Sequence, residues 1–199
     1  SSLNLGFHRG DREEAVQENF RRIGASMGVR CEDMVLSRQT HTTNVWVVTE
    51  EDRGMGMTCS MEYSKRASEN PGRSASGGFQ LEANGKLEGV DGLVTNIPGI
   101  CLVTFYADCV PLFFVDPVKK VIGLSHSGWR GTVGKIGRVT VELMQQQYGC
   151  EPCDILAAVG PSVCRDCYEV SGDVIERFRE SFAEKYWKDL FYQKENGKY

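Results

Sequence analysis

Cys109 and His126 flank a predicted β-hairpin in a way that suits metal binding or nucleophilic catalysis. Residues 116–119, Asp-Pro-Val-Lys, separate two apolar runs and predict a tight turn with proline at its second position. A hairpin centred on that turn places Phe113 opposite Ile122 and Cys109 opposite His126. Directly opposed residues have Cβ atoms about 4.5–5.5 Å apart. A thiolate and an imidazole at that separation can share one metal ion.

The residues that begin at His126 predict a strand-to-helix turn able to approach an anion. Residues 125–132 are Ser-His-Ser-Gly-Trp-Arg-Gly-Thr. Glycines allow the backbone to come close to a ligand, and a helix start presents free N–H groups. Arg130 adds a guanidinium that can bind phosphate through two parallel hydrogen bonds. The alternative is an ordinary turn with a solvated Arg130.

Hydrophobic periodicity predicts the elements that must position these residues. A helix is expected over 12–28, opened by a capping box between Asp11 and Glu14 and closed by Gly28. Two more helices are expected over 132–148 and 173–187. Runs of β-forming residues predict strands at 35–39, 45–49, 92–95, 100–106, 112–115, 121–125 and 155–159. Strands mixed with helices predict a single α/β (α+β) domain over residues 1–199, with a mixed sheet flanked by helices.

Residues 54–87 do not follow this periodicity. They are rich in Gly, Ser, Glu, Asn and Lys, and only 78–82 have a strand-like composition. A segment of this length without regular elements is uncommon inside a compact domain. We therefore predict an insertion or a lid over 54–87.

The overall composition excludes several classes of protein. The 199 residues are 41% apolar and 25% charged, with a net charge of −4, which fits a soluble domain with its own core. The acidic balance argues against a nucleic-acid or anionic-membrane surface. No apolar run approaches the roughly 18 residues of a spanning helix, and no secretory signal is recognisable. Eight cysteines beside an adequate core predict reduced thiols and a cytoplasmic protein.

Two Cys-x-x-Cys pairs form a second candidate metal site. Cys150 with Cys153 and Cys164 with Cys167 have the spacing typical of structural zinc. The ten residues between the pairs include the strand predicted at 155–159. An extended segment of that length carries the chain more than about 20 Å. We therefore expect the two pairs not to share one ion.

Short motifs spread along the chain carry a family resemblance. They are Asn-Leu-Gly at 4–6 with Gly-Asp at 10–11, Gln-Thr-His at 39–41, Ala-Asp-Cys-Val-Pro at 107–111, His-Ser-Gly-Trp-Arg-Gly-Thr at 126–132 and Gly-Pro-Ser at 160–162. Together they resemble the YfiH/YlmD family of laccase-domain proteins, which are related to FAMIN. Thr42 departs from the glycine usual in this family and predicts a narrower approach to the metal. The family's C-terminal portion is missing after Tyr199, which predicts a truncated domain.

The resemblance implies a fold, a metal and a reaction. The fold is YfiH-like, and the zinc ligands carried over by motif are His41, Cys109 and His126. The implied activity is phosphorolysis of adenosine, inosine and methylthioadenosine to the free base and a pentose 1-phosphate, with adenosine deaminase activity. Purine nucleosides and phosphate are then the partners. Older descriptions call the family a copper polyphenol oxidase, which makes copper the alternative metal.

These two reactions give roles to residues near the predicted ligands. Two histidines and one thiolate leave a fourth zinc position open, where the pKa of water falls to about 7 for attack on the purine. Phosphorolysis requires a bound phosphate, for which we expect Arg130 and the amides of Gly131 and Thr132. Asp108, beside the thiol, is expected to help manage charge on the purine.

Other interpretations use the same residues. Without a metal, Cys109 is a nucleophile activated by His126, as in a cysteine hydrolase or deamidase. The kinship of this family's fold with bacterial toxin deamidases supports that alternative. A zinc-binding module without catalysis is a further alternative. Copper suits a His/Cys site, but three ligands from one site cannot build a multicopper oxidase centre.

Overall fold

The computed structural model describes residues 3–7, 10–57 and 87–199. The possible strand at 78–82 and most of the predicted insertion therefore lie outside the described residues. The helices and strands are α1 (Glu13–Met27), β1 (Met34–Arg38), β2 (Val45–Val47), β3 (Leu87–Glu88), β4 (Gly92–Thr95), β5 (Cys101–Val103), β6 (Val110–Asp116), β7 (Val121–Ser127), α2 (Trp129–Val133), α3 (Ile136–Tyr148), β8 (Leu156–Val159), α4 (Gly172–Ser181) and α5 (Trp187–Leu190). This order confirms the predicted mixed α+β fold.

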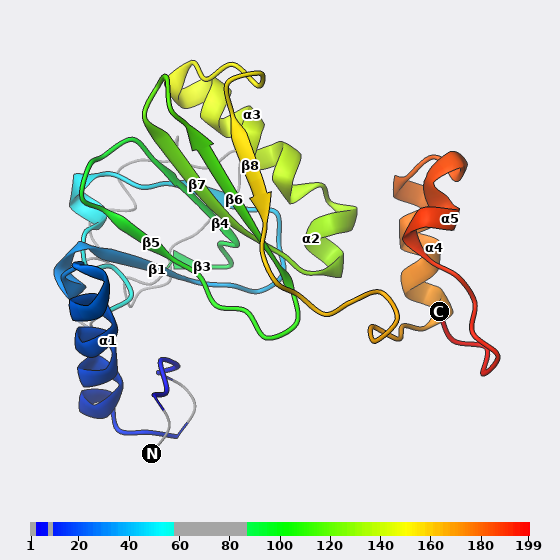
Figure 1. Ribbon diagram of the computed structural model, residues 1–199, viewed down its shortest axis with the longest axis horizontal. Coiled ribbons are helices and arrows are strands. Elements are labelled where there is room, and N and C mark those ends of the chain that lie inside the picture. Colours follow the sequence, from blue (N-terminus) through cyan, green and yellow to red (C-terminus); the bar gives the residue numbers. More distant parts are fainter. Residues whose placement is uncertain (1–2, 8–9, 58–86) are drawn as a thin grey trace.

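The strands form two sheets (Figure 1). A three-stranded sheet has the order β3-β1-β5, with both pairs parallel. A five-stranded sheet has the order β2-β4-β7-β6-β8, in which β2 and β4 are parallel and the other pairs are antiparallel. The chain passes from β1 in the first sheet to β2 in the second through the loop 39–44. That loop carries His41, so its course places one candidate ligand between the sheets.

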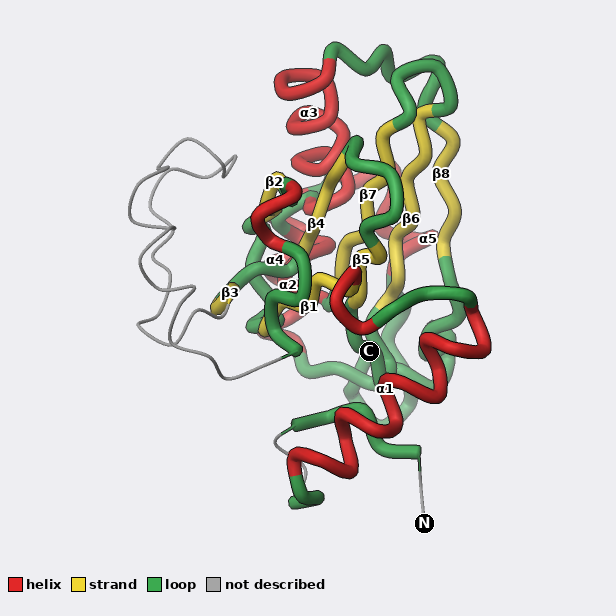
Figure 2. The backbone as a smooth tube through the Cα atoms, turned by 90° about the vertical axis from the view of Figure 1, so that its left-hand side faces the viewer, coloured by secondary structure: helices red, strands yellow, loops and turns green. Residues whose placement is uncertain are grey.

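Helices cover these sheets with apolar faces. Figure 2 shows α3 along one face of the five-stranded sheet, where Ile136, Leu143 and Met144 pack against strand residues including Val94 and Phe114. A second cluster includes Trp46 and Leu93 and joins β1 to the five-stranded sheet. The apolar face of α1 packs on β1 in a third cluster. Its buried members are Val16, Phe20, Met34, Leu36 and Met57.

Helix α1 begins without the predicted capping box. Its N-cap is Arg12, whose side chain makes no capping hydrogen bond. The Asp11 carboxylate lies one residue before the N-cap position and accepts a hydrogen bond from the Asn4 amide at 2.8 Å. The predicted end of the helix is confirmed, because Gly28 has φ 70°, a left-handed conformation that glycine adopts without strain.

The predicted helix over 132–148 is two helices. Lys135 has a left-handed φ of 60° and separates α2 from α3. At the same break the chain packs on the loop before β2, where a Cβ on Gly134 would lie 2.5 Å from Thr43 Cγ2. The predicted helix over 173–187 is likewise interrupted, because α4 ends at Ser181 and α5 begins at Trp187.

The β6–β7 hairpin turns over four residues, 117–120, instead of the predicted two. The Asp116 carboxylate accepts the backbone N–H groups of Val118 and Lys119, each at 2.8 Å. Lys120 has a left-handed φ of 56° and returns the chain to β7. The Asp116 side chain and the left-handed Lys120 therefore close a turn that is longer than the one predicted from the position of Pro117.

This turn shifts the hairpin register, and the predicted pairing of Cys109 with His126 is wrong. Phe113 faces Leu124 instead of Ile122, and Pro111 faces His126. Cys109 lies just before β6, beyond the last backbone pair. Its contact with the histidines therefore depends on side-chain reach across the end of the hairpin.

Within the part of the chain described here, no helix is both long and apolar enough to cross a membrane.

Replacing Gly92 by alanine is expected to destabilise the fold by about 1–3 kcal/mol, the usual cost of overpacking a core. A Cβ at this position in β4 would lie 2.7 Å from Ser125 Oγ and 2.9 Å from Val45 Cγ2. Chemical denaturation measures the effect. The matched control is Gly172→Ala, where a Cβ meets no atom within 4 Å. Equal stability of the two variants would contradict the prediction.

Candidate metal centre

The three predicted ligands come together at one edge of the five-stranded sheet. His126 lies near the end of β7, and Cys109 lies immediately before β6. These strands are antiparallel, so the end of one and the start of the other share an edge. His41 reaches the same edge from the loop between β1 and β2. The sheet topology therefore assembles three residues that are far apart in the sequence.

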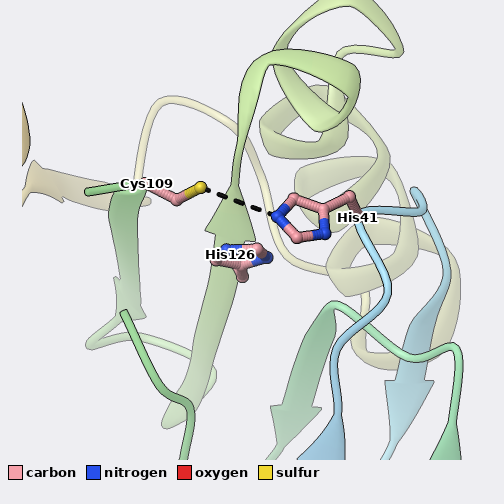
Figure 3. Close-up of side chains that lie close together, drawn as sticks. All are labelled: His41, Cys109 and His126. Carbon is pink, nitrogen blue, oxygen red and sulfur yellow. Dashed lines mark hydrogen bonds between the residues drawn. The ribbon is translucent and has the colours of Figure 1, made fainter. Parts of the chain in front are cut away.

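The donor atoms are spaced to bind one ion. The ligand atoms of His41, Cys109 and His126 all lie within 4.8 Å of one another. Cys109 Sγ lies 3.8 Å from His41 Nε2, the contact drawn in Figure 3. Tetrahedral zinc with bonds of about 2.0–2.3 Å needs donors about 3.5 Å apart. The N₂S set therefore fits zinc with small adjustments and leaves a fourth position free.

Burial is graded across the three ligands. His126 is 4% exposed, Cys109 is half-buried and His41 is exposed. The centre is thus anchored in the core at His126 and opens to solvent on the side of His41. That arrangement gives a small molecule access to an ion held here.

Asp91 is a further residue of the candidate site, and the sequence motifs do not point to it. It is fully buried directly before β4, and its Oδ1 lies 2.8 Å from His126 Nδ1. The carboxylate fixes the orientation of the imidazole and leaves Nε2 to bind a metal, a common arrangement around ligating histidines. The sequence does contain one indication of this residue: a carboxylate within the apolar run 90–94. Such a carboxylate is expected to be buried, and a buried charge requires hydrogen-bond or ionic partners.

The same carboxylate also positions His41. Asp91 accepts the backbone N–H groups of Thr40, His41 and Thr42 at 3.2, 3.0 and 2.7 Å. These bonds hold His41 at φ 65°, a left-handed conformation that is unusual for histidine. Asp91 therefore organises two of the three ligands at once.

Thr42, which stands where the family usually has glycine, adds a further bond to this carboxylate. Its hydroxyl lies 2.7 Å from Asp91 Oδ2 and 2.8 Å from the Gly89 carbonyl oxygen. The side chain is thus used to support the loop 39–44.

Negative charge accumulates around the donors. Burial raises the pKa of Asp91, but hydrogen bonds from His126, Thr42 and Thr40 outweigh it and hold the pKa below its ordinary value. Burial raises the pKa of the Cys109 thiol, and the carboxylates of Asp108 and Asp91 raise it further. A bound cation would offset this charge.

Gly128 provides the space in which the ligands meet. A Cβ on this residue would lie 2.8 Å from His41 Cδ2 and 3.0 Å from Cys109 Sγ. The glycine-rich turn therefore allows a close approach of the backbone, as predicted, but the groups that it approaches are two candidate metal ligands.

The predicted phosphate-binding residues Arg130, Gly131 and Thr132 lie within α2. Arg130 is exposed, and its guanidinium lies 4.4 Å from the centroid of the Trp129 ring. Among the described residues it makes no ion pair with a carboxylate. The Thr132 amide donates to the Gly128 carbonyl at 2.8 Å, so it is already satisfied within the helix. Gly131 is buried against the His126 carbonyl. Arg130 is thus the group best placed to meet an anion.

The surroundings of Asp108 and of the Cys109 thiol differ from those expected for a metal-free cysteine nucleophile activated by His126. Asp108 is exposed at the rim, and its carbonyl accepts the Val163 amide at 3.0 Å. The polar contact of the Cys109 sulfur is with His41, whereas the alternative assigned that contact to His126. His126 directs Nδ1 to Asp91 instead.

The four cysteines of the Cys-x-x-Cys pairs do not converge. Cys150 is buried beside Asp116, whose carboxylate, together with burial, raises the pKa of the thiol to about 12. Cys164 lies near the other end of β6, beyond Val163. Within the described residues, His41, Cys109 and His126 are the one group of three or more potential ligands that could hold a metal.

Fold and site together define an α+β protein with a candidate His₂Cys metal centre. The family model described as "Multi-copper polyphenol oxidoreductase laccase" matches residues 1–199. This chain belongs to that family.

Named relatives and a solved structure agree with this assignment. Purine nucleoside phosphorylase YlmD of Bacillus subtilis is 36% identical over 178 residues, which are 89% of this chain and 56% of the relative. Adenosine deaminase RL5 of an unknown prokaryotic organism is 36% identical over 181 residues, 91% of this chain and 60% of the relative. The crystal structure of Bacillus licheniformis hypothetical protein YfiH superimposes with a TM-score of 0.81 at 30% identity, covering 100% of this chain and 65% of that one. The chain thus spans less than two thirds of each of these proteins.

Proposed function

We propose that this protein is a zinc-dependent purine nucleoside phosphorylase that also deaminates adenosine. The observation that carries the proposal is the His41–Cys109–His126 donor set, whose ligand atoms lie within 4.8 Å of one another beside a buried carboxylate. The names of the relatives, purine nucleoside phosphorylase and adenosine deaminase, support the reaction class. A cytoplasmic location belongs to the same proposal and fits the seven described cysteines, all of which are free.

Zinc is proposed over copper because of the donor set. Two imidazoles and one thiolate with a free fourth position are typical of catalytic zinc. A multicopper oxidase needs further ligand groups, and the described residues supply one such group. When bound, zinc would supply a Lewis acid with an open position for water or substrate.

The residues of the chain have separate tasks in this proposal. Asp91 holds the His126 imidazole through Nδ1 and fixes the loop of His41, so the open side of the centre keeps its shape. Asp108, exposed beside Cys109, exchanges a proton with the purine as charge develops on the ring. Arg130 binds phosphate for attack on the sugar carbon that carries the base, which breaks the glycosidic bond.

The proposed substrates share a purine joined to a pentose. Adenosine, inosine and methylthioadenosine would each give the free base and a pentose 1-phosphate. In deamination, water would attack the ring carbon that bears the amino group, and the bond to that nitrogen would break, giving inosine and ammonia. The two reactions are therefore distinguished by their dependence on phosphate.

Adenosine turnover by the zinc-loaded chain, with and without phosphate, tests the function. We expect ribose 1-phosphate and adenine when phosphate is present, inosine in both conditions, and one zinc ion per chain by native mass spectrometry. Removing the metal with a chelator is expected to abolish both products. Turnover that survives the chelator would favour Cys109 as a nucleophile. Stoichiometric zinc without turnover would favour a binding module, and copper-dependent oxidation of a phenol would favour an oxidase.

Arg130→Ala is expected to raise the KM for phosphate by about 10- to 100-fold, the loss of one charge-assisted bidentate contact of about 1.5–3 kcal/mol. The rate of adenosine deamination should change little, because that reaction uses no phosphate. Steady-state kinetics at varied phosphate measure the effect. Arg138→Ala is the matched control, since Arg138 is an exposed arginine on α3 that pairs with Glu142. An unchanged KM for phosphate would refute the role of Arg130.

A further inference from the structure

The exposed pair Cys164 and Cys167 lies outside the metal centre and has a geometry of its own. The two residues are the ends of a tight turn, in which the Cys167 amide donates to the Cys164 carbonyl at 3.1 Å. The Tyr168 amide donates to the same carbonyl at 3.0 Å. The first and last Cα atoms of such a turn lie within about 7 Å of each other, and disulfides span Cα separations of about 4.4–6.8 Å. The turn therefore holds the two thiols where a bond between them needs little backbone movement.

The environment of the two sulfur atoms is asymmetric. The neighbouring Cys167 thiol and the backbone N–H groups of Cys167 and Asp166 lower the pKa of Cys164, whereas the proximity of Cys164 raises the pKa of Cys167. A thiol stabilised as thiolate beside a protonated partner is the arrangement of a nucleophilic and a resolving cysteine.

Neighbouring segments fix the turn from both sides. Lys194 donates to the Asp166 carbonyl at 3.0 Å, and Tyr192 donates to the Asp166 carboxylate at 3.1 Å. On the N-terminal side the Val163 amide is bonded to the Asp108 carbonyl at 3.0 Å. The turn is thus organised before any bond forms between the thiols, although both cysteines remain accessible to solvent.

We propose that Cys164 and Cys167 form a redox-active dithiol that exchanges with low-molecular-weight disulfides such as oxidised glutathione. The Cys164 thiolate attacks one sulfur of the small disulfide, forming a mixed disulfide and releasing one thiolate. Cys167 then loses its proton and attacks the Cys164 sulfur, closing the protein disulfide and releasing the second thiolate. The protein loses two electrons, and the small disulfide gains them as two thiols.

This redox site adjoins the metal centre without sharing a residue with it. Val163, the residue before Cys164, donates its amide to the carbonyl of Asp108, the residue before Cys109, at 3.0 Å. The turn therefore begins close to the centre in the fold. The proposal concerns a second site and does not depend on nucleoside chemistry.

Trypsin provides a direct assay, because Arg165 lies between the two cysteines. Cleavage separates the peptide 139–165, which contains Cys164, from the peptide 166–177, which contains Cys167. We expect the zinc-loaded full chain, treated with oxidised glutathione and then alkylated, to give these two peptides joined by a disulfide. Reduction before alkylation should release them separately.

Three variants make the result specific. Cys164→Ser should abolish the joined peptides, whereas Cys153→Ser, a change at an exposed cysteine in the same peptide, should retain them. In Cys167→Ser the mixed disulfide should accumulate on Cys164, on the order of tenfold faster than on Cys153.

Separate glutathione adducts on Cys164 and Cys167 in the unmodified chain would overturn the proposal. Joined peptides in Cys164→Ser would overturn it equally, since another cysteine would then be the partner. The joined peptides and the glutathione adducts are both measured without nucleoside turnover. Failure of the redox proposal is therefore distinguishable from failure of the proposed function.

Discussion

Asp91→Asn is expected to weaken zinc binding by about 10- to 100-fold, the usual cost of removing a carboxylate that orients a ligating histidine. The substitution keeps the size of the side chain, but an amide cannot accept all the bonds that this carboxylate receives. His126 loses its fixed orientation, and the loop of His41 loses the anchor of three backbone N–H groups. Competition with a chromophoric chelator measures the affinity.

A matched variant separates this positioning role from general stability. Asp52 is also a buried carboxylate, and its hydrogen-bond donors include the Thr49 amide, at 2.7 Å, and the Trp46 indole. Asp52→Asn should lower the free energy of unfolding while leaving zinc affinity within about twofold, because buried hydrogen bonds contribute about 1–3 kcal/mol to stability. If Asp91→Asn and Asp52→Asn changed zinc affinity equally, the positioning role of Asp91 would be rejected.

Gly128→Ala is expected to abolish stoichiometric zinc binding with a smaller effect on stability. The new methyl group would overlap His41 Cδ2 and Cys109 Sγ, at 2.8 and 3.0 Å. His41 is exposed on a loop, so it can move aside and relieve the clash at a cost of about 1–3 kcal/mol or less. Displacement of one donor leaves two ligands, which is too few for a stable zinc site.

Native mass spectrometry and thermal unfolding, measured on the same sample, check this prediction. Gly172→Ala serves as the control, since its Cβ meets nothing within 4 Å and lies on α4. Full zinc occupancy in Gly128→Ala would show that the centre tolerates the methyl group. A large loss of stability with retained zinc would assign Gly128 a role in folding instead.

Several features of this protein were predictable from local sequence. Gly28 ends α1 because a left-handed residue at that point favours glycine, and the apolar spacing before it marks the buried face of the helix. The short motifs identified the family and three ligand positions that the structure brings together. Their roles as zinc ligands stay predictions, as do those of Asp108, Arg130, Gly131 and Thr132.

Other features depended on side-chain and tertiary contacts that hydrophobic periodicity does not indicate. The hairpin register differs by two residues from the prediction because the Asp116 side chain closes a longer turn. Lys135 interrupts the predicted helix at a point where the chain packs against Thr43. Asp11 is bonded to Asn4 and does not cap α1. In each case a side chain or neighbouring segment outweighed the local preference.

The sequence alone determined which chemical groups its motifs supply: two imidazoles, one thiol and a glycine-rich turn. Tertiary structure decided how those groups meet, because strand order and register bring the ends of β6 and β7 to the loop of His41. It also revealed Asp91 as their common support and left the Cys-x-x-Cys pairs apart. A buried carboxylate must find its hydrogen-bond donors wherever the fold provides them, and local sequence does not specify that choice.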